Sequence, residues 1–435
     1  MDGSRRTALK TAAAAIAAVA TDAAVSASEL SVTHPKSTRP RVVIVGGGWS
    51  GLSIAKYTRI FAPSSEVILI EQRDLFISCP VSNLWLVDKV ETDFLMHDYL
   101  RGARNYDYTF LHATVYDVDK QRQIVFTTHG EVAYDYLVLA TGIEYDYSRW
   151  TRDPAVETAL RTRYPAAFRP GSEHWTLKEK IRQFKGGIFL MTVPSGNYRC
   201  LPAPYERAAL VADYFKHNAI KGKVLLLDEN NDITIKEHGF HTAYRALYRD
   251  YLQWEPNAVI ERIDLEAKKV HTEFDTYAFD DASFYPHVRG AALLEKIGLA
   301  KDSYYNRLEG DMDAITYTAK GYPTIFIAGD ARKMGFSKSG NTALSEGQHV
   351  AKLIAARIQG RSISWESPVT LCISAVSAYP ERGIFIHSEY AYDPKTDTFR
   401  FATPVTDEVW QGEEGLQNGQ NVYRWARSCY ADLFG

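Results

Sequence analysis

The sequence predicts an α/β protein, and three observations support this. The run 41–45 is β-branched from its second residue onward, which is typical of a fully buried parallel strand. A glycine-rich segment follows at once and opens a helical pattern that continues to about Ile60. A second apolar strand spans Glu66–Ile70. Strand, helix and strand in this order form a βαβ unit, the building block of doubly wound sheets.

The composition is that of an ordinary globular chain. It has 435 residues, of which 46% are apolar and 24% charged, enough for two or three domains. The formal net charge of −3 argues against a nucleic-acid-binding protein, which would carry a strongly basic face. No stretch of the mature chain approaches about 18 consecutive apolar residues, so the sequence predicts no membrane span. Four cysteines are too few for a disulfide scaffold but enough for one functional pair.

Residues 1–27 are predicted to be an export signal rather than part of the fold. Arg5 and Arg6 lie in a charged start, an Ala-rich stretch runs to Ala20, and small residues end at Ala27. This order matches a signal peptide with its cleavage site, and the adjacent arginines fit a twin-arginine signal. We therefore expect a periplasmic protein whose mature chain starts near Ser28. A disordered Ala-rich tail is the alternative.

Further elements follow along the chain. Strands are expected at 108–111, 123–127, 136–139, 187–193, 223–227 and 324–328, and helices at 205–216 and 341–358. The stretch 228–275 mixes aromatic and charged residues without a clear period, and it predicts no element.

A glycine motif joins the first strand to its helix. Gly46, Gly48 and Gly51 form G-x-G-x-x-G. The first permits a tight turn, the second lets the backbone approach a pyrophosphate, and the third allows close helix packing, while the helix N-terminus faces the phosphates. Glu71 follows the second strand at the spacing expected for a carboxylate that binds a ribose. Together these residues predict a dinucleotide site.

Two later segments favour FAD over NAD. Thr141 and Gly142 follow the strand Tyr136–Leu139, as in many flavoproteins with two dinucleotide domains. Another apolar strand ends at Gly329 and Asp330, and a helix begins soon after. In such flavoproteins the aspartate hydrogen-bonds the ribityl chain, and the helix N-terminus stabilises an anionic reduced flavin. The alternative for Asp330 is an ordinary residue of a helix-entry turn.

The second nucleotide site that reductases of this architecture carry is missing. The strand 187–193 is followed by the segment 194–207, which holds one glycine, three prolines and Cys200. Such a segment cannot form the glycine-rich phosphate cradle. Electrons are therefore expected from a small donor, and a cysteine stands where that donor would meet the flavin.

Several motifs of this chain resemble one known family, the flavoprotein subunit of flavocytochrome c sulfide dehydrogenase. They are Arg199-Cys200 continuing through Pro204-Tyr205-Glu206-Arg207-Ala208, Cys79 with Ser82-Asn83, Gly329-Asp330 with Lys338-Ser339-Gly340, and Cys372 about sixty residues before a Phe-Gly terminus. The resemblance covers residues 41–435 and implies the glutathione reductase fold. Its domains would be a discontinuous FAD-binding domain (40–150 and 285–360), a second dinucleotide-type domain without an NAD(P)H fingerprint (151–284) and a C-terminal α+β interface domain (361–435).

The resemblance also implies roles for the cysteines. Cys200 and Cys372 match the family's redox-active disulfide, a pairing that the sequence alone does not select. Cys79 matches a cysteine bonded covalently to the 8α-methyl group of FAD. The alternative for Cys200 and Cys372 is a purely structural disulfide. The alternative for Cys79 is a small buried cysteine without a cofactor bond. Cys429 matches no family role and is expected to be a buried free thiol.

Two further residues match the family's active site. Glu206 matches a glutamate that would take the substrate proton, which requires burial to raise its pKa. A solvated carboxylate at a helix start is the alternative. Trp425 matches a tryptophan near the flavin, and ordinary core packing is the alternative.

The resemblance implies FAD-dependent oxidation of sulfide to sulfur or polysulfide, with electrons passed to a c-type cytochrome carrying one or two haems. No C-x-x-C-H motif occurs in the chain, so haem would belong to a partner subunit. A sulfide:quinone oxidoreductase would need a membrane-facing amphipathic C-terminus, whereas the end 418–435 is short and mixed. A pyridine-nucleotide disulfide reductase would need the second glycine motif. In a subunit that keeps FAD only for structural reasons, sulfide would not reduce the flavin.

Overall fold

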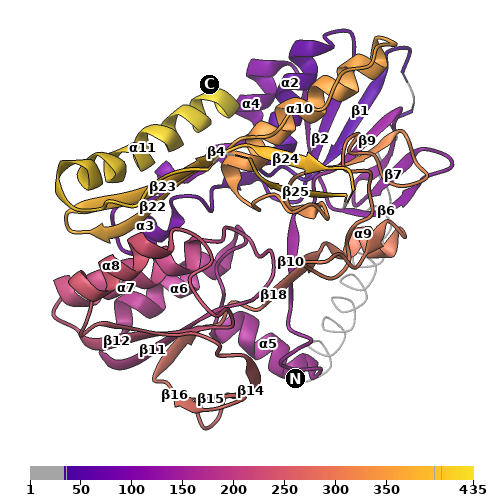
Figure 1. The fold of residues 1–435 in the computed structure, drawn as a ribbon. Helices are drawn as coiled ribbons and strands as arrows, with labels where there is room; N and C mark the ends of the chain where they lie inside the picture. The colour runs from indigo at the N-terminus through magenta and orange to yellow at the C-terminus, as the bar shows by residue number, and fades with distance from the viewer. Residues whose placement is uncertain (1–33, 36, 396, 403) are drawn as a thin grey trace, which may run out of the picture.

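The computed structural model describes residues 34–435 except 36, 396 and 403. The export signal predicted at residues 1–27 lies outside the described residues. The α/β class is confirmed, because two separate parallel sheets carry helices that connect their strands (Figure 1). The strands and helices expected by residue range are present, with ends shifted by no more than two residues.

The first parallel sheet has the strand order β21-β9-β1-β2-β5. These strands are β1 (Arg41–Val45), β2 (Glu66–Glu71), β5 (Thr109–His112), β9 (Tyr136–Leu139) and β21 (Ile325–Ile327). All five residues of β1 are buried, as its β-branched sequence requires of a central strand. The strand of this sheet that comes last in the sequence is β21, which follows the whole second domain and pairs with β9. This part of the molecule is therefore discontinuous in sequence.

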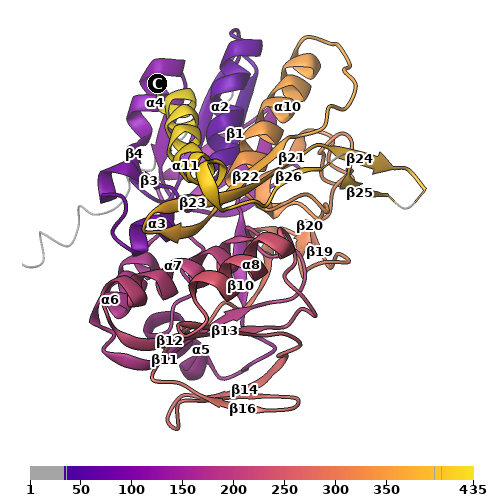
Figure 2. The ribbon, with the colours of Figure 1, turned by 60° about the vertical axis from the view of Figure 1, so that its left-hand side comes forward.

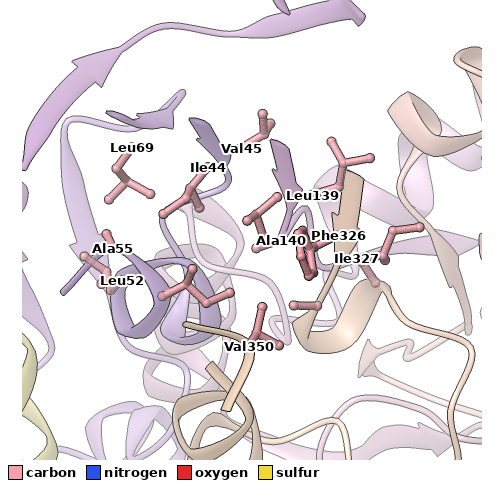
Figure 3. Close-up of a cluster of buried hydrophobic side chains, with 14 of the residues drawn as sticks. Ile44, Val45, Leu52, Ala55, Leu69, Leu139, Ala140, Phe326, Ile327 and Val350 are labelled. Carbon is pink, nitrogen blue, oxygen red and sulfur yellow. The ribbon is translucent and has the colours of Figure 1, made fainter. Parts of the chain in front are cut away.

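Two helices cover one face of this sheet. They are α2 (Trp49–Phe61), which follows the glycine motif, and α10 (Gly340–Ile358). Ile44, Leu69, Leu139, Phe326 and Val350 lie buried between the sheet and these helices (Figure 3). This core fixes where β1 ends and α2 begins, and it therefore positions the glycine motif.

The second parallel sheet has the order β13-β12-β11-β17. Its strands are β11 (Gly186–Val193), β12 (Lys221–Asp228), β13 (Leu252–Glu255) and β17 (Asp281–Ser283). The crossover from β11 to β12 is α7 (Ala203–His217), and α6 (Ser172–Gln183) precedes β11. The stretch 228–275, for which no element was expected, forms α8 (Glu237–Leu247), β13 and the antiparallel strands β14 (Ile260–Asp264) and β15 (Lys269–Thr272).

A C-terminal layer completes the fold. The antiparallel strands β22 (Thr370–Ala378), β23 (Glu381–Ser388) and β26 (Val405–Asp407) lie between α11 (Gly412–Phe434) and the side of the second domain that carries α7 (Figures 1 and 2). The chain end that was predicted to be short and mixed is thus a 23-residue helix. Its glycines, asparagines and aromatic residues have low helix propensity and obscured the period. No helix in the described part of the chain is long and apolar enough to cross a membrane.

The remaining elements are short hairpins and connectors. They are β3 (Leu75–Ile77), α3 (Ser82–Leu86), η1 (Thr92–Phe94), β4 (Met96–Asp98), α4 (Tyr99–Tyr106), β6 (Val115–Asp119), β7 (Ile124–Thr127), β8 (Gly130–Ala133), β10 (Ile143–Asp146), α5 (Pro154–Arg163), β16 (Thr276–Ala278), β18 (His287–Gly290), α9 (Ala292–Lys296), β19 (Ala300–Lys301), β20 (Glu309–Gly310), η2 (Gly329–Ala331), β24 (Tyr390–Asp393) and β25 (Thr398–Phe401).

Candidate active site

A cleft of about 470 Å³ opens at the carboxyl ends of the first sheet's strands. Doubly wound sheets bind nucleotides at this edge. The predicted cofactor residues that line it are Gly46, Gly48, Glu71, Thr141, Gly142, Gly329 and Asp330. The structure therefore brings together residues from four separate segments of the sequence.

The three motif glycines have different tasks in this cleft. Gly46 has φ +106°, and a Cβ there would lie 2.3 Å from the Ala140 carbonyl oxygen. Gly51 does not line the cleft; its Cβ would lie 1.9 Å from the Gly46 carbonyl oxygen, so it lets α2 pack on the loop. A Cβ on Gly48 would meet nothing within 4 Å. The backbone at Gly48 is therefore open to a phosphate at the start of α2.

Polar atoms in the cleft fit a dinucleotide. Glu71 lies where a ribose-binding carboxylate is expected, at the end of β2. Its Oε2 accepts a hydrogen bond from Gly47 N at 2.7 Å. Thr141 Oγ1 and Asp330 Oδ1 are buried and have no hydrogen-bond partner among the described residues. Buried polar atoms of a native protein are nearly always paired, so both fit a ligand that supplies the missing partners.

A second, smaller cavity of about 80 Å³ adjoins the cleft, and Arg199, Ser339 and Gly340 line both. Three of the four cysteines line this cavity: Cys79, Cys200 and Cys372. They come from the loop before α3, the loop before α7 and β22, so all three parts of the fold contribute one. Glu206 and Trp425 line it as well. The fold thus gathers every predicted redox residue at one point.

Cys200 and Cys372 interact directly and are both free thiols in this structure. The hydrogen bond from Cys200, together with the nearby Lys236 ammonium, holds the pKa of Cys372 well below its usual range. The same hydrogen bond and burial raise the pKa of Cys200. Cys200 also has φ +58°, a left-handed conformation that a residue with a side chain rarely adopts, and its N–H donates to the Lys338 carbonyl oxygen at 2.8 Å.

Glu206 faces the cysteine cavity and is otherwise enclosed by protein. Its Oε2 accepts a hydrogen bond from Asn83 Nδ2 at 2.9 Å, and its Oε1 accepts one from Ala375 N at 2.9 Å. Burial raises the pKa of Glu206 to about 7. It is therefore not the solvated helix-start carboxylate that the sequence left open, and it can exchange a proton near neutral pH.

Cys79 lines the same cavity from the side of the first domain. Its Sγ lies 3.8 Å from the Phe168 carbonyl oxygen, and burial raises the pKa of its thiol. Trp425, on α11, stacks on Trp49 with ring centroids 5.9 Å apart. Cys429 lies outside both cavities, buried and unbonded as expected, and burial raises its pKa to about 12.

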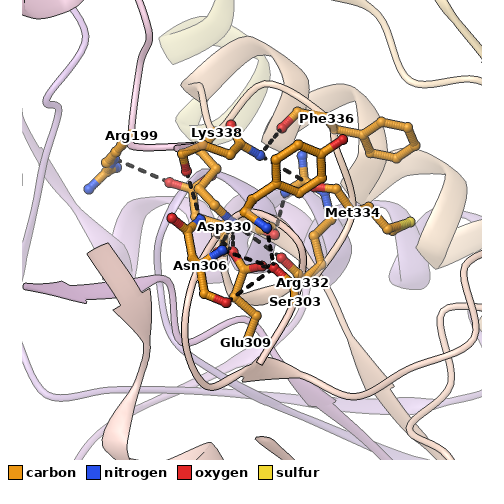
Figure 4. A network of polar contacts seen from close by, with 12 residues as sticks. Arg199, Ser303, Asn306, Glu309, Asp330, Arg332, Met334, Phe336 and Lys338 are labelled. Carbon is orange, nitrogen blue, oxygen red and sulfur yellow. Dashed lines mark hydrogen bonds and ion pairs between the residues drawn. The ribbon is translucent and has the colours of Figure 1, made fainter. Parts of the chain in front are cut away.

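A buried polar network joins the cleft to the cysteine loop (Figure 4). Arg199 Nε lies 3.2 Å from Asp330 Oδ2. Lys338 Nζ lies 2.8 Å from Glu309 Oε1, and both side chains are almost fully buried. Charged pairs buried in this way fix one arrangement of a loop more than they add stability. Sequence reasoning assigned no role to Arg199, Lys338, Asn83 or Lys236, because each contacts a partner far away in the chain.

The corresponding end of the second sheet is filled by the chain's own side chains. Ser195 Oγ donates to Glu229 Oε2 at 3.0 Å, and His287 Nε2 lies 2.8 Å from the same oxygen. Ser195 and Glu229 follow β11 and β12, at the edge where a dinucleotide would bind in such a domain, and His287 begins β18. This cluster agrees with the missing second glycine motif.

Two family models match the sequence. Residues 175–283 match the sulfide dehydrogenase (flavocytochrome c) flavoprotein chain, central, and residues 40–164 match the pyridine nucleotide-disulphide oxidoreductase model. A short sulfide dehydrogenase (flavocytochrome c) flavoprotein sequence from Chlorobaculum thiosulfatiphilum is 54% identical over 43 residues, which are 10% of this chain and 90% of that sequence.

Longer relatives are more distant. The mitochondrial sulfide:quinone oxidoreductase of Schizosaccharomyces pombe is 21% identical over 409 residues, 84% of each chain. That of Dictyostelium discoideum is 29% identical over 220 residues, 46% of this chain and 45% of that protein. The solved sulfide:quinone oxidoreductase of Aquifex aeolicus superposes with a TM-score of 0.72 at 15% identity, covering 90% of this chain and 92% of that one. This likeness shows a shared fold.

Proposed function

We propose that this chain, which belongs to the sulfide dehydrogenase (flavocytochrome c) flavoprotein family of the pyridine nucleotide-disulphide oxidoreductases, oxidises sulfide with FAD as the electron acceptor. The observation that carries the proposal is the small cavity beside the nucleotide cleft. Cys200, Cys372 and Glu206 meet there although they come from two different domains. Since the second sheet has no open nucleotide site, a small donor that reaches this cavity supplies the electrons.

The cleft residues hold FAD. The backbone at Gly46 and Gly48 receives the pyrophosphate at the start of α2, and Glu71 binds a ribose. The unpaired Oδ1 of Asp330 would accept a hydrogen bond from the ribityl chain of bound FAD. Cys79 is the site of a covalent bond to the flavin, which keeps the cofactor from dissociating. Its place in the cysteine cavity, beside Arg199, supports this assignment.

The cysteine pair performs the sulfur chemistry. In the oxidised protein Cys200 and Cys372 are joined by a disulfide. Hydrosulfide attacks one sulfur and forms a new S–S bond, and the electron pair of the broken bond leaves on the other cysteine as a thiolate. A second hydrosulfide removes the outer sulfur of the persulfide as hydrodisulfide, so both cysteines become reduced. FAD, when bound, accepts the two electrons released as the disulfide re-forms, and it passes them on singly.

Glu206 handles the proton of the substrate. Its carboxylate faces both cysteines across the cavity, and its pKa of about 7 lets it accept a proton near neutral pH. The hydrogen bonds from Asn83 and Ala375 fix its orientation. Trp425 lines the cavity on the side of α11.

A c-type cytochrome on a separate subunit is the proposed electron acceptor. The family description of residues 175–283 supports this choice, and the chain has no haem-attachment motif of its own. The apolar side chains of α11 are packed against the fold, which favours a cytochrome over a quinone held at a membrane surface. The arginine pair and Ala-rich stretch of residues 1–27 support periplasmic export by a twin-arginine signal.

Anaerobic titration of the FAD-loaded protein with sulfide tests the function. We expect sulfide to bleach the visible flavin band rapidly and NADH to leave it unchanged. Cys372→Ser, which removes the disulfide, should abolish bleaching, whereas Cys429→Ser should bleach normally. Added cytochrome c should restore the band faster than a soluble quinone, and the reverse order would identify a sulfide:quinone oxidoreductase. If sulfide leaves the flavin of the wild-type protein oxidised, the FAD has only a structural role.

A further inference from the structure

Lys236 is a buried cation that contacts one cysteine of the pair. It is 3% exposed, and its Nζ lies 3.5 Å from Cys372 Sγ. The same ammonium donates hydrogen bonds to Ser374 Oγ at 2.6 Å and to the Cys372 carbonyl oxygen at 2.9 Å. Within the described residues no carboxylate lies within ion-pair distance of it. Its hydrogen bonds are therefore satisfied, but it forms no ion pair with an acidic side chain, and Glu206 interacts with its charge only at longer range.

The backbone holds Lys236 in this place. Lys236 precedes α8 and has φ +56°, in the left-handed region that side-chain-bearing residues seldom occupy. Cys200, in the other loop that reaches the cavity from the second domain, has the same unusual conformation at φ +58°. A surrounding structure that keeps residues in such conformations is typical of functional sites.

A buried ammonium is stable only if an anion compensates it. The groups that face Cys372 are Cys200 and Glu206 from the α7 side, Lys236 from the loop before α8 and Ser374 on its own strand. Of these, Lys236 alone is a cation. The thiolate of Cys372 is therefore the anion that the lysine contacts directly, whereas Glu206 interacts with it from beyond ion-pair distance.

Among the residues that the structure describes, no cation contacts the sulfur of Cys200, and the Lys236 ammonium lowers the pKa of Cys200 less than burial and Glu206 raise it. The neighbouring Arg199 guanidinium points to Asp330, and the Lys338 ammonium is paired with Glu309. The carboxylate of Glu206 disfavours a negative charge on Cys200. The two sulfurs of the pair thus differ strongly in how well each one carries a negative charge.

We propose that Lys236 is a catalytic residue that fixes the polarity of the cysteine pair, so that hydrosulfide attacks Cys200 Sγ and the electron pair leaves on Cys372 Sγ. The inference rests on the proposed function and adds the direction of its first step. Hydrosulfide supplies the electron pair of the new bond to Cys200, the Cys200–Cys372 bond breaks, and the resulting thiolate lies beside the Lys236 ammonium. Thiol–disulfide exchange favours the leaving sulfur whose thiolate is more stable. The persulfide then forms on Cys200, on the loop that opens α7.

Alkylation of the reduced FAD-loaded protein measures this asymmetry without any sulfide. Iodoacetamide is applied over a pH series, and mass spectrometry follows the peptides of Cys200 and Cys372. We expect Cys372 to react at lower pH than Cys200. Lys236→Gln, which keeps hydrogen-bond donors but loses the charge, should raise the pH midpoint of Cys372 by about one to three units. Lys236→Arg should restore most of the difference.

Lys178→Gln is the matched control. Lys178 is also a buried lysine of the second domain, but it contacts Trp85 and Asp88 rather than a cysteine. Its loss should leave the midpoint of Cys372 unchanged. Bound FAD and the near-ultraviolet circular dichroism spectrum of each variant establish that it is folded, and Lys236→Met is a second neutral variant if the glutamine variant does not fold.

A single addition of one equivalent of sulfide to the oxidised protein then locates the persulfide. Its presence on Cys200 supports the proposal, and its presence on Cys372 overturns it. An unchanged Cys372 midpoint in both neutral variants overturns it as well. Failure of the proposed function gives a different result. Sulfide then does not reduce the flavin, whichever of the two cysteines is alkylated at lower pH.

Discussion

The Arg199 guanidinium lies with its Nε 3.2 Å from Asp330 Oδ2, so the residue before Cys200 is ion-paired with an aspartate of the nucleotide cleft. Arg199 also donates to the Phe168 carbonyl oxygen at 3.0 Å, and it lines both cavities. The loop that carries Cys200 is thereby held to the cofactor site by a charged contact. A shift of either loop would change the position of the other.

Arg199→Met should therefore destabilise the protein as well as disturb the site. The change leaves the buried Asp330 carboxylate without its cation, and breaking a buried pair from one side costs about 3 kcal/mol in the free energy of unfolding. Urea denaturation of the apoprotein measures it. Lys352→Met removes the exposed pair with Glu366 and should cost less than about 1 kcal/mol. Similar losses in both variants would contradict the role assigned to Arg199.

Glu206→Gln should remove one limb of the pH profile for flavin reduction by sulfide. Below a pH of about 7 the carboxyl group of Glu206 is protonated and cannot accept a proton, and above it the carboxylate is available. The wild-type rate, expressed per hydrosulfide anion, should therefore rise as the pH increases through about 7. The variant should show no such rise and be roughly 100-fold to 10,000-fold slower at its best.

Stopped-flow measurement of flavin bleaching at fixed hydrosulfide concentration checks this expectation. Glu173→Gln is the control, since burial also raises the pKa of Glu173 but its side chain binds Tyr145 and lies outside the cysteine cavity. The control should keep the rising limb. A rising limb that persists in Glu206→Gln would assign the proton transfer to another group.

Gly48→Ala and Gly51→Ala should fail in different ways. The new methyl group at position 48 meets no protein atom, so the apoprotein should fold normally, but it occupies the space that the phosphates need and should lower FAD content. At position 51 the methyl group would lie 1.9 Å from the Gly46 carbonyl oxygen, so the loop and α2 must separate. Thermal melting of both apoproteins, with FAD content per chain, measures the difference. Equal melting temperatures would contradict it.

Cys79→Ser should convert covalently bound FAD into dissociable FAD. Acid precipitation should leave the yellow colour in the wild-type pellet and release it into the supernatant of the variant. Cys429→Ser, which changes a buried cysteine outside both cavities, should retain the flavin. Flavin released from the wild-type protein would remove the covalent bond from the proposal but leave the sulfide chemistry intact.

The nucleotide cleft was predictable from sequence because its features are local. A buried strand, the glycines Gly46, Gly48 and Gly51, and Glu71 at the end of the next strand lie within about 30 residues, and such a βαβ unit has one way to fold. The segment after β11 also predicts that the second sheet lacks a phosphate loop, since it has prolines where such a loop needs glycines. In these segments the residues of a motif are close together in the sequence, and the local fold therefore places them close together in space.

The cysteine cavity was not predictable from spacing. Cys200 and Cys372 are brought together by the packing of α7 on β22, and only a family resemblance suggested the pair. Lys236 carries no sequence signal, because a lone lysine in a polar segment predicts a solvated side chain. The helix α11 was missed since its residues have low helix propensity, and its stability comes from tertiary packing of one face.

The assembly of the cysteine pair from two distant segments has a consequence for how the protein matures. Cys372 lies on a strand that leaves the ribosome after both nucleotide-type domains have been synthesised, so Cys200 has no correct partner until the last layer docks. If the pair forms the disulfide of the proposed function, its oxidation is the final event of folding. A chain that has acquired the Cys200–Cys372 bond therefore reports that all three parts of the molecule have come together.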